Sequence, residues 1–101
     1  MMTIVTRVTL KAGSEPEWDA AMRERLETAK KRDGWIGAQL VMPLDKLNQR
    51  MIIGTWRNRA DWEAWHNDPA FAETRERMAG LEAGKGEQWW HEVLIDERAS
   101  G

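Results

Sequence analysis

The sequence predicts an α+β fold whose elements follow one another in the order β-α-β-β-α-β. Four segments alternate apolar and polar residues or are rich in β-branched side chains, which is typical of strands. The segments between them carry apolar residues at spacings of three and four, which is typical of amphipathic helices. At 101 residues the chain has room for one domain. We assign residues 1–97 to that domain and residues 98–101 to a C-terminal tail.

The first strand is predicted over residues 3–11 (TIVTRVTLK). One of its faces carries Ile4, Thr6, Val8 and Leu10. A helix follows, with Ser14 as its N-cap and Glu17 at the third helical position, the pattern of a capping box. The inner stripe of this helix is predicted to be Trp18, Met22, Leu26 and Ala29. The basic run 30–32 suits the negative end of the helix, and Gly34 suits a left-handed residue that closes it.

A hairpin is predicted in the middle of the chain. Residues 35–42 (WIGAQLVM) and 49–56 (QRMIIGTW) form its two strands, and the turn-forming residues 43–48 connect them.

Two helical pieces come next. Asn58 can cap a short helix, with Asp61 three residues further on, and Asp68-Pro69 starts a second helix as N-cap and first-turn proline. The short helix places Trp62 and Trp65 on one face, and the second carries Phe71, Thr74, Arg75 and Met78 at helical spacing.

The last strand is predicted over residues 88–96 (QWWHEVLID), after a loose connection that contains three glycines. One face of this strand carries Trp89, His91, Val93 and Ile95. The resulting order is the ferredoxin-like arrangement, with helices on one face of a four-stranded antiparallel sheet. The bare face would carry Val5 and either Ile52 or Ile53, so we expect a homodimer through that face.

Composition excludes several classes of function. The formal net charge is -2, and the 15 basic and 17 acidic residues are interspersed, which argues against nucleic-acid binding. The chain has no cysteine, and its two histidines fall on separate elements, so we expect no metal site. Neither a long apolar run nor a cleavage signal is present, so we expect a cytoplasmic protein without membrane association.

The aromatic content is unusual, with seven tryptophans, one phenylalanine and no tyrosine. A buried indole N–H requires an acceptor, so tryptophan is an awkward residue for filling a core. It suits the wall of a half-open cavity, where a flat ligand can stack on the ring. Composition alone leaves both interpretations open.

The pattern of residues resembles the antibiotic biosynthesis monooxygenase (ABM) family over nearly the whole chain, from Ile4 to Val93. The most specific part is a strand ending in Gly54-Thr55-Trp56, followed by a short helix with an aromatic residue and His66 at its end and the Asp68-Pro69 break. The resemblance implies a dimeric α+β barrel with a cavity between sheet and helices, closed partly by the partner's last strand.

The resemblance and the residue types together nominate site residues. Candidate catalytic residues are His66, Trp65, Arg75 and Asn58, and candidate substrate-binding residues are Trp62, Phe71, Met78, Trp89 and His91. Either His66 or His91 could be the base. Each has a structural alternative. Trp65 can simply pack the short helix, His66 can satisfy a helix end, Arg75 can extend into solvent, and Asn58 can be only a cap.

Members of this family include enzymes that oxidise aromatic polyketide intermediates with molecular oxygen and no bound cofactor, haem degraders, and quinol oxidases. The resemblance therefore implies a cofactor-independent monooxygenase acting on a hydrophobic polycyclic aromatic or quinol substrate. A non-catalytic binding or interaction module is the alternative. Haem degradation is disfavoured, because the haem-binding His of those members would fall at Arg75 and their first-strand Asn at Thr6.

Overall fold

The fold is a single antiparallel sheet with all helices packed on one side. The computed structural model describes residues 1–99. Its elements are β1 (Met2–Thr9), α1 (Glu15–Ala29), β2 (Trp35–Val41), β3 (Gln49–Trp56), α2 (Arg59–His66), α3 (Pro69–Ala79) and β4 (Glu87–Glu92). The strand order is β2-β3-β1-β4, with every neighbouring pair antiparallel. The predicted ferredoxin-like α+β fold is therefore confirmed; of the predicted tail, residues 100 and 101 lie outside the described part.

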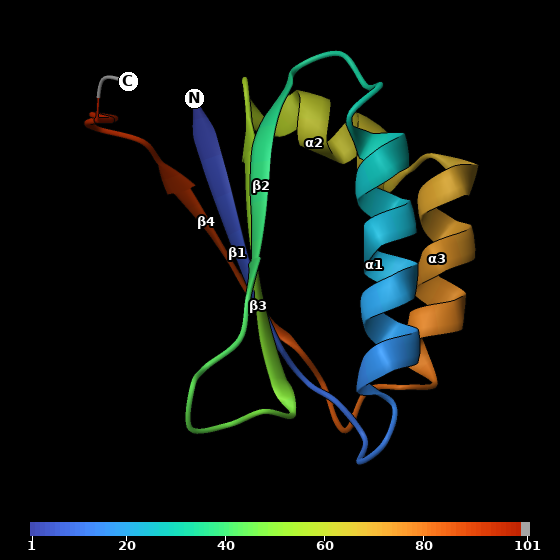
Figure 1. Cartoon of the computed structure of the whole chain (residues 1–101). Coiled ribbons are helices and arrows are strands. Elements are labelled where there is room, and N and C mark those ends of the chain that lie inside the picture. The colour runs from blue at the N-terminus through green and yellow to red at the C-terminus, as the bar shows by residue number, and fades with distance from the viewer. Residues whose placement is uncertain (100–101) are drawn as a thin grey trace.

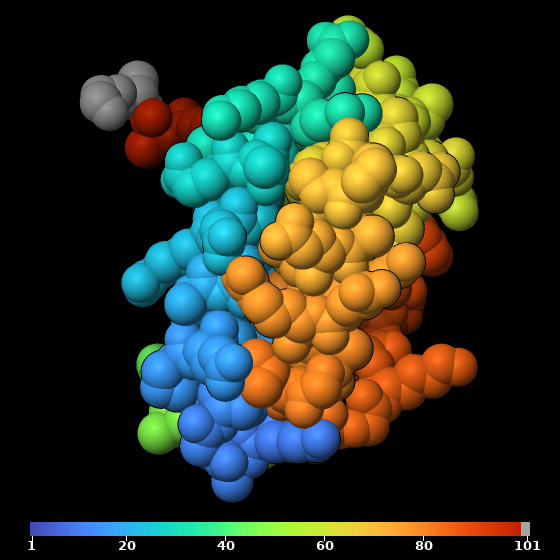
Figure 2. Space-filling view, turned by 90° about the vertical axis from the view of Figure 1, so that its right-hand side faces the viewer, coloured from blue at the N-terminus to red at the C-terminus, as the bar shows by residue number. Residues whose placement is uncertain are grey.

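The helices form one layer over the sheet (Figure 1). Helices α1 and α3 lie side by side along the strands, and α2 crosses one end of the sheet. Figure 2 shows this layer from outside, with α1 and α3 next to each other. None of the helices in residues 1–99 is both long and apolar enough to cross a bilayer.

The helix starts follow the sequence signals with one exception. Asn58 accepts a hydrogen bond from the Asp61 backbone N–H (2.9 Å), and Asp68 accepts one from the Ala70 N–H (2.8 Å), so both predicted caps are confirmed. Ser14 is the N-cap residue of α1, as predicted, but the side-chain hydrogen bond of the predicted capping box is absent. Its hydroxyl instead donates to two backbone carbonyls, those of Lys11 (2.6 Å) and Leu81 (2.9 Å), which ties the start of α1 to the segment after α3.

The last strand is shorter than predicted. It ends at Glu92, since β1 offers pairing partners only from Met2 to Arg7 along this edge. Leu94 and Ile95 lie beyond it and are 89% and 79% exposed.

Two clusters of buried residues fill the space between sheet and helices. The cluster at the α2 end consists of Met2, Ile4, Ala29, Trp56, Trp62, Trp65 and Phe71. The cluster at the other end consists of Val8, Leu10, Trp18, Ala21, Met22 and Met78. Four of the seven tryptophans are thus core residues, and the space between the two clusters is where a cavity can form.

Gly34 connects α1 to β2 in the left-handed conformation predicted for it, with φ +86°. An added Cβ would lie 2.7 Å from the Cβ of Asp61, whose carboxylate accepts a hydrogen bond from Arg57 (2.7 Å). Gly13 has nearly the same φ, +85°, with no atom within 4 Å of the corresponding position. The two glycines therefore share a backbone conformation and differ in their surroundings.

We expect Gly34→Ala to destabilise the fold more than Gly13→Ala. Both variants would pay the left-handed penalty of about 1–2 kcal/mol, and Gly34→Ala would add roughly 1–3 kcal/mol for displacing the Asp61 side chain. Urea unfolding of both variants measures the difference. Equal losses would show that Asp61 moves aside at no cost.

Candidate functional site

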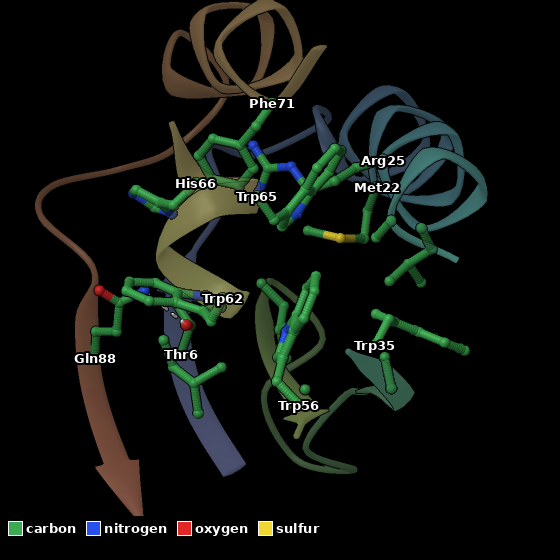
Figure 3. A pocket seen from close by; sticks show the side chains of 16 residues that line it. Thr6, Met22, Arg25, Trp35, Trp56, Trp62, Trp65, His66, Phe71 and Gln88 are labelled. Carbon is green, nitrogen blue, oxygen red and sulfur yellow. Dashed lines mark hydrogen bonds between the residues drawn. The ribbon is translucent and has the colours of Figure 1, made fainter. Parts of the chain in front are cut away.

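A hollow of about 110 Å³ lies between the sheet and the helices (Figure 3). Its walls come from β1, α1, β2, β3, α2, α3 and β4, so the whole fold is needed to form it. The side chains that line it are mainly apolar; the polar exceptions are Thr6, Arg25, His66 and Gln88. An apolar cavity with a few converging polar groups is the usual form of a small-molecule site.

Trp65 and Phe71 form part of the aromatic wall of this hollow, together with Trp35, Trp56 and Trp62. The Trp65 and Phe71 rings meet edge to face with centroids 5.7 Å apart, and Trp65 is only 4% exposed. The sequence placed both residues at the site, and both line the hollow. Trp65 also belongs to the buried cluster at the α2 end, so it is a core residue as well as part of the wall, and its catalytic role stays a prediction.

His66 stands at the end of α2 between two aromatic rings. Its imidazole centroid lies 4.2 Å from that of Phe71 and 4.6 Å from that of Trp62. Burial lowers the pKa of His66 below 6.5, and the positive charges of Arg75 and Arg25 lower it further. The imidazole is therefore neutral at neutral pH and can accept a proton.

Arg25 on α1 was missed at the sequence level and is the cation of this site. Its guanidinium carbon lies 4.2 Å from the Phe71 ring centroid, and its Nε donates to the Thr74 hydroxyl (3.0 Å). Among the described residues it has no carboxylate partner within 4.0 Å. Burial lowers its pKa to about 10, so it stays charged at neutral pH. The charge of Glu82 partly offsets this lowering of the Arg25 pKa, although the two groups form no direct ion pair. A partly buried cation without a directly bound carboxylate suits an anionic ligand.

The spacing of α1 carries the signal that identifies Arg25. Trp18, Met22, Arg25 and Ala29 follow one another at intervals of four, three and four, which places all four on the face toward the sheet. The predicted stripe used Leu26 instead, which is partly buried beside Arg25 and also lines the hollow.

Two grooves adjoin the hollow, because they share lining residues with it. One, of about 220 Å³, shares Thr6, Arg25, Ile52 and Phe71 with the hollow and extends toward α3. The other, of about 310 Å³, shares Leu26, Trp35 and Ala38 with it at the β2 edge. The hollow alone is close in size to a cavity that holds one benzene ring, about 150 Å³. A fused-ring ligand would extend into a groove.

Arg75 and Met78, both nominated from the sequence, lie at the α3 groove and not in the hollow itself. The Arg75 side chain is exposed, and its guanidinium carbon lies 5.7 Å from the Phe71 ring centroid. Met78 is 2% exposed and belongs to the core.

Asn58 does not line the hollow. It is exposed, and its side-chain oxygen accepts the hydrogen bond from the Asp61 backbone N–H that caps α2. Trp62 does line the hollow, and its outer edge packs against Trp90, with ring centroids 5.5 Å apart.

Trp89 and His91 lie on the face of the sheet opposite to the hollow. In the register, Trp89 pairs with Val5 and His91 with Thr3, whereas Trp90 pairs with the buried Ile4. The nomination of Trp89 and His91 as lining the same pocket as Trp65 is therefore wrong for the single chain. The other face of β4 supplies Gln88 to the hollow, where its side-chain amide donates to the Thr6 hydroxyl (3.3 Å).

The described residues contain no group of three or more His, Asp or Glu side chains close enough to one another to hold a metal ion. The chemical content of the hollow is thus an aromatic wall, a neutral imidazole and an uncompensated guanidinium.

Comparisons with known proteins agree on the fold. The chain superposes on SnoaB, a cofactor-independent oxygenase from Streptomyces nogalater, with a TM-score of 0.85 at 18% identity, covering 94% of each chain. A Nitrosomonas europaea protein named after the ABM family gives a TM-score of 0.88 at 15% identity, covering 94% of this chain and 100% of that one. A haem oxygenase (mycobilin-producing) of Mycobacterium tuberculosis is 24% identical over 97 residues, which are 96% of this chain and 92% of that protein.

The family model described as antibiotic biosynthesis monooxygenase matches residues 1–77, a span that runs from β1 through most of α3 and includes every candidate catalytic residue. The chain belongs to the antibiotic biosynthesis monooxygenase family.

Proposed function

We propose that this chain is a monooxygenase that oxidises an aromatic or quinol substrate with molecular oxygen and without a bound cofactor. The observation that carries the proposal is the placement of a neutral imidazole and an uncompensated guanidinium around one aromatic ring, at the wall of an apolar hollow. SnoaB, which shares this fold, is a cofactor-independent oxygenase, and this likeness supports the proposal.

The chemistry follows from the electronic state of oxygen. Triplet oxygen reacts poorly with closed-shell molecules, so the substrate must become electron-rich enough to donate single electrons. Removal of a proton from an anthrone or a quinol produces such an anion. His66 is placed to take this proton, and the Arg25 guanidinium to stabilise the negative charge that forms.

The oxidation can be written with a balanced count of atoms. The substrate anion passes one electron to oxygen, and the radical pair combines to a peroxide at the carbon that lost the proton. For an anthrone, loss of water from that peroxide leaves a carbonyl group, so its CH₂ group and O₂ become C=O and H₂O. A quinol has no such CH₂ group, and its two electrons and two protons pass to O₂, which gives the quinone and H₂O₂. The residues of the hollow bind the ring, hold the charge and exclude bulk water.

Haem is a poor fit to this site. The hollow is smaller than the cavity of about 150 Å³ that holds a single ring, so a tetrapyrrole would have to fill both adjoining grooves as well. His66 is the histidine that lines the hollow, and Arg75 stands at the position where the family's haem degraders would carry their haem-binding histidine. The mycobacterial relative is a haem oxygenase, and we do not propose that activity for this chain.

We also propose a homodimer through the bare face of the sheet. Val5, Ile53 and Trp89 lie side by side there in the register, and the edge residues Ile36 and Val41 are exposed. Covering these apolar side chains would remove them from water.

We expect oxygen consumption with an anthrone or a naphthohydroquinone, and we expect His66→Gln to slow it by roughly 10²–10⁴-fold at neutral pH. Since the pKa of His66 is lowered, the rate should be at its plateau at pH 7 and fall only below pH 6.5, where the imidazole gains a proton. An oxygen electrode measures both effects. The matched control is His91→Gln, on the far face, which should leave rate and pH profile unchanged.

Two results would count against this proposal. No oxygen uptake with any substrate that is shown to bind would indicate a binding module instead. An acid limb that persists unchanged in His66→Gln would mean that another group takes the proton.

A further inference from the structure

We infer that the ligand of this site carries an acidic group on a short arm, and that Arg25 and Arg75 bind this group in the groove beside α3. The inference rests on the proposed function only in placing an aromatic ring in the hollow. It adds a class of substrate, an aromatic acid, and a binding site for the acid.

The groove is continuous with the hollow. Both spaces are lined by Thr6, Arg25, Ile52 and Phe71, so a ring in the hollow lies next to the groove, across the Phe71 and Arg25 side chains. The floor of the groove is apolar, formed by Val8, Trp18 and Met78. A short arm on such a ring could therefore extend into the groove.

The two arginines of the groove are uncompensated. Ion pairs in residues 1–99 engage Arg32, Arg50, Arg57, Arg59, Arg77 and Arg98. Arg25 and Arg75 are in none of them, although they come from different helices and approach the same Phe71 ring, at 4.2 and 5.7 Å. Two cations held near one another raise the free energy of the empty site, and the positive charge of Arg75 lowers the pKa of Arg25. An anion between them would relieve this repulsion.

The groove contains one acidic residue, Glu82, and it does not neutralise the pair. Its carboxylate lies within 4.0 Å of no cation in the described chain. Burial raises the pKa of Glu82, partly offset by the neighbouring Trp18 and Arg25, so its negative charge is also destabilised here. The net charge of the groove is positive, and a guanidinium pair matches the two oxygens of a carboxylate.

A pair of probes that differ only in charge tests this inference. We choose 3-phenylpropionate and its neutral amide, 3-phenylpropionamide, each with a single ring and a short arm. Binding is followed by NMR through the indole N–H signals of the seven tryptophans, of which Trp65 reports on the hollow and Trp18 on the groove. The acid should bind at least about tenfold more tightly than the amide, the worth of one or two charge-assisted hydrogen bonds.

Three variants identify the cause of that preference. Arg75→Gln should bring the acid close to the amide in affinity, and Arg75→Lys should restore part of the preference, because Lys keeps the charge without the forked geometry. Arg77→Gln, two residues along the same helix and exposed, should have no effect. Arg75 is itself exposed, so these variants should fold normally.

The outcomes separate this inference from the proposed function. Equal binding of acid and amide, or a preference that survives Arg75→Gln, would overturn the inference even if oxygen uptake is found. Neither probe is oxidised, so a preference that disappears in Arg75→Gln would support the inference even if every oxygen-uptake experiment fails.

Discussion

Arg25→Met is expected to make the protein more resistant to urea while it removes most of the oxygen-uptake activity. Methionine keeps the length of the side chain and its contact with the Phe71 ring but removes a charge that has no carboxylate partner. Replacing a buried ion pair with apolar side chains of similar volume is often neutral or stabilises proteins by about 1–4 kcal/mol, and a charge without a direct partner lacks the attraction that offsets its desolvation in such a pair. The Thr74 hydroxyl loses one partner but still donates to the Phe71 carbonyl (2.9 Å), so no new unsatisfied group is left.

The loss of activity has a separate cause. If Arg25 holds the substrate anion, its removal should slow oxygen uptake by about 10²-fold or more, as removal of a single charge-stabilising donor does in other enzymes. Opposite signs of the two effects distinguish a functional cation from a structural one. The control is Arg77→Met, which loses only an exposed ion pair with Glu24 that for this reason contributes little to stability, and which should keep full activity.

Urea unfolding and oxygen-electrode rates on the same preparations decide the matter. A variant that loses stability and keeps its rate would show that Arg25 is a structural residue whose charge is tolerated by the fold. A variant that loses both stability and oxygen uptake would show that the fold needs the guanidinium to shape the hollow.

The strands and helices were predictable because each is specified by local physics. The alternation of Ile4 and Val8 with polar neighbours defines β1, and the side-chain caps at Asn58 and Asp68 define where α2 and α3 begin. Ser14 shows the limit of such signals. Its hydroxyl could cap the helix but donates a hydrogen bond to the Leu81 carbonyl instead. That partner is 67 residues away, and no local sequence pattern reveals it.

The site was only partly predictable, for a geometric reason. Alternation along β4 shows that Trp89 and His91 share a face, but the pairing of Trp90 with Ile4 decides which face that is, and this pairing is a long-range property. Arg25 was missed for a related reason. A charged residue on a helix is expected in solvent, and only the packing of α1 against Phe71 shows that this one turns inward.

Ile53→Lys is expected to convert the proposed homodimer into monomers. Ile53 occupies the centre of the bare sheet face, where it pairs in register with Val5 on β1 and Gln39 on β2, and Val5 pairs in turn with Trp89. In a twofold dimer the same patch meets itself, so each substitution places two lysines in the interface. Burying these charges without partners would cost several kcal/mol per dimer, enough to raise the dissociation constant by roughly 100-fold or more.

The folded protomer should survive this change, because Ile53 points away from both core clusters and the lysine stem can lie along the sheet. Analytical ultracentrifugation over a range of concentrations measures the shift in the dissociation constant.

Leu44→Lys is the matched control, since Leu44 lies in the connection between β2 and β3 and is 93% exposed, so the same charge there should leave the dimer intact. A wild-type protein that sediments as a monomer at high micromolar concentration would contradict the proposed interface. One protomer supplies an aromatic lining of its own, so we expect a monomeric Ile53→Lys variant still to bind a ring beside Trp65. Any loss of oxygen uptake in that variant would then measure what the partner contributes to enclosing the site.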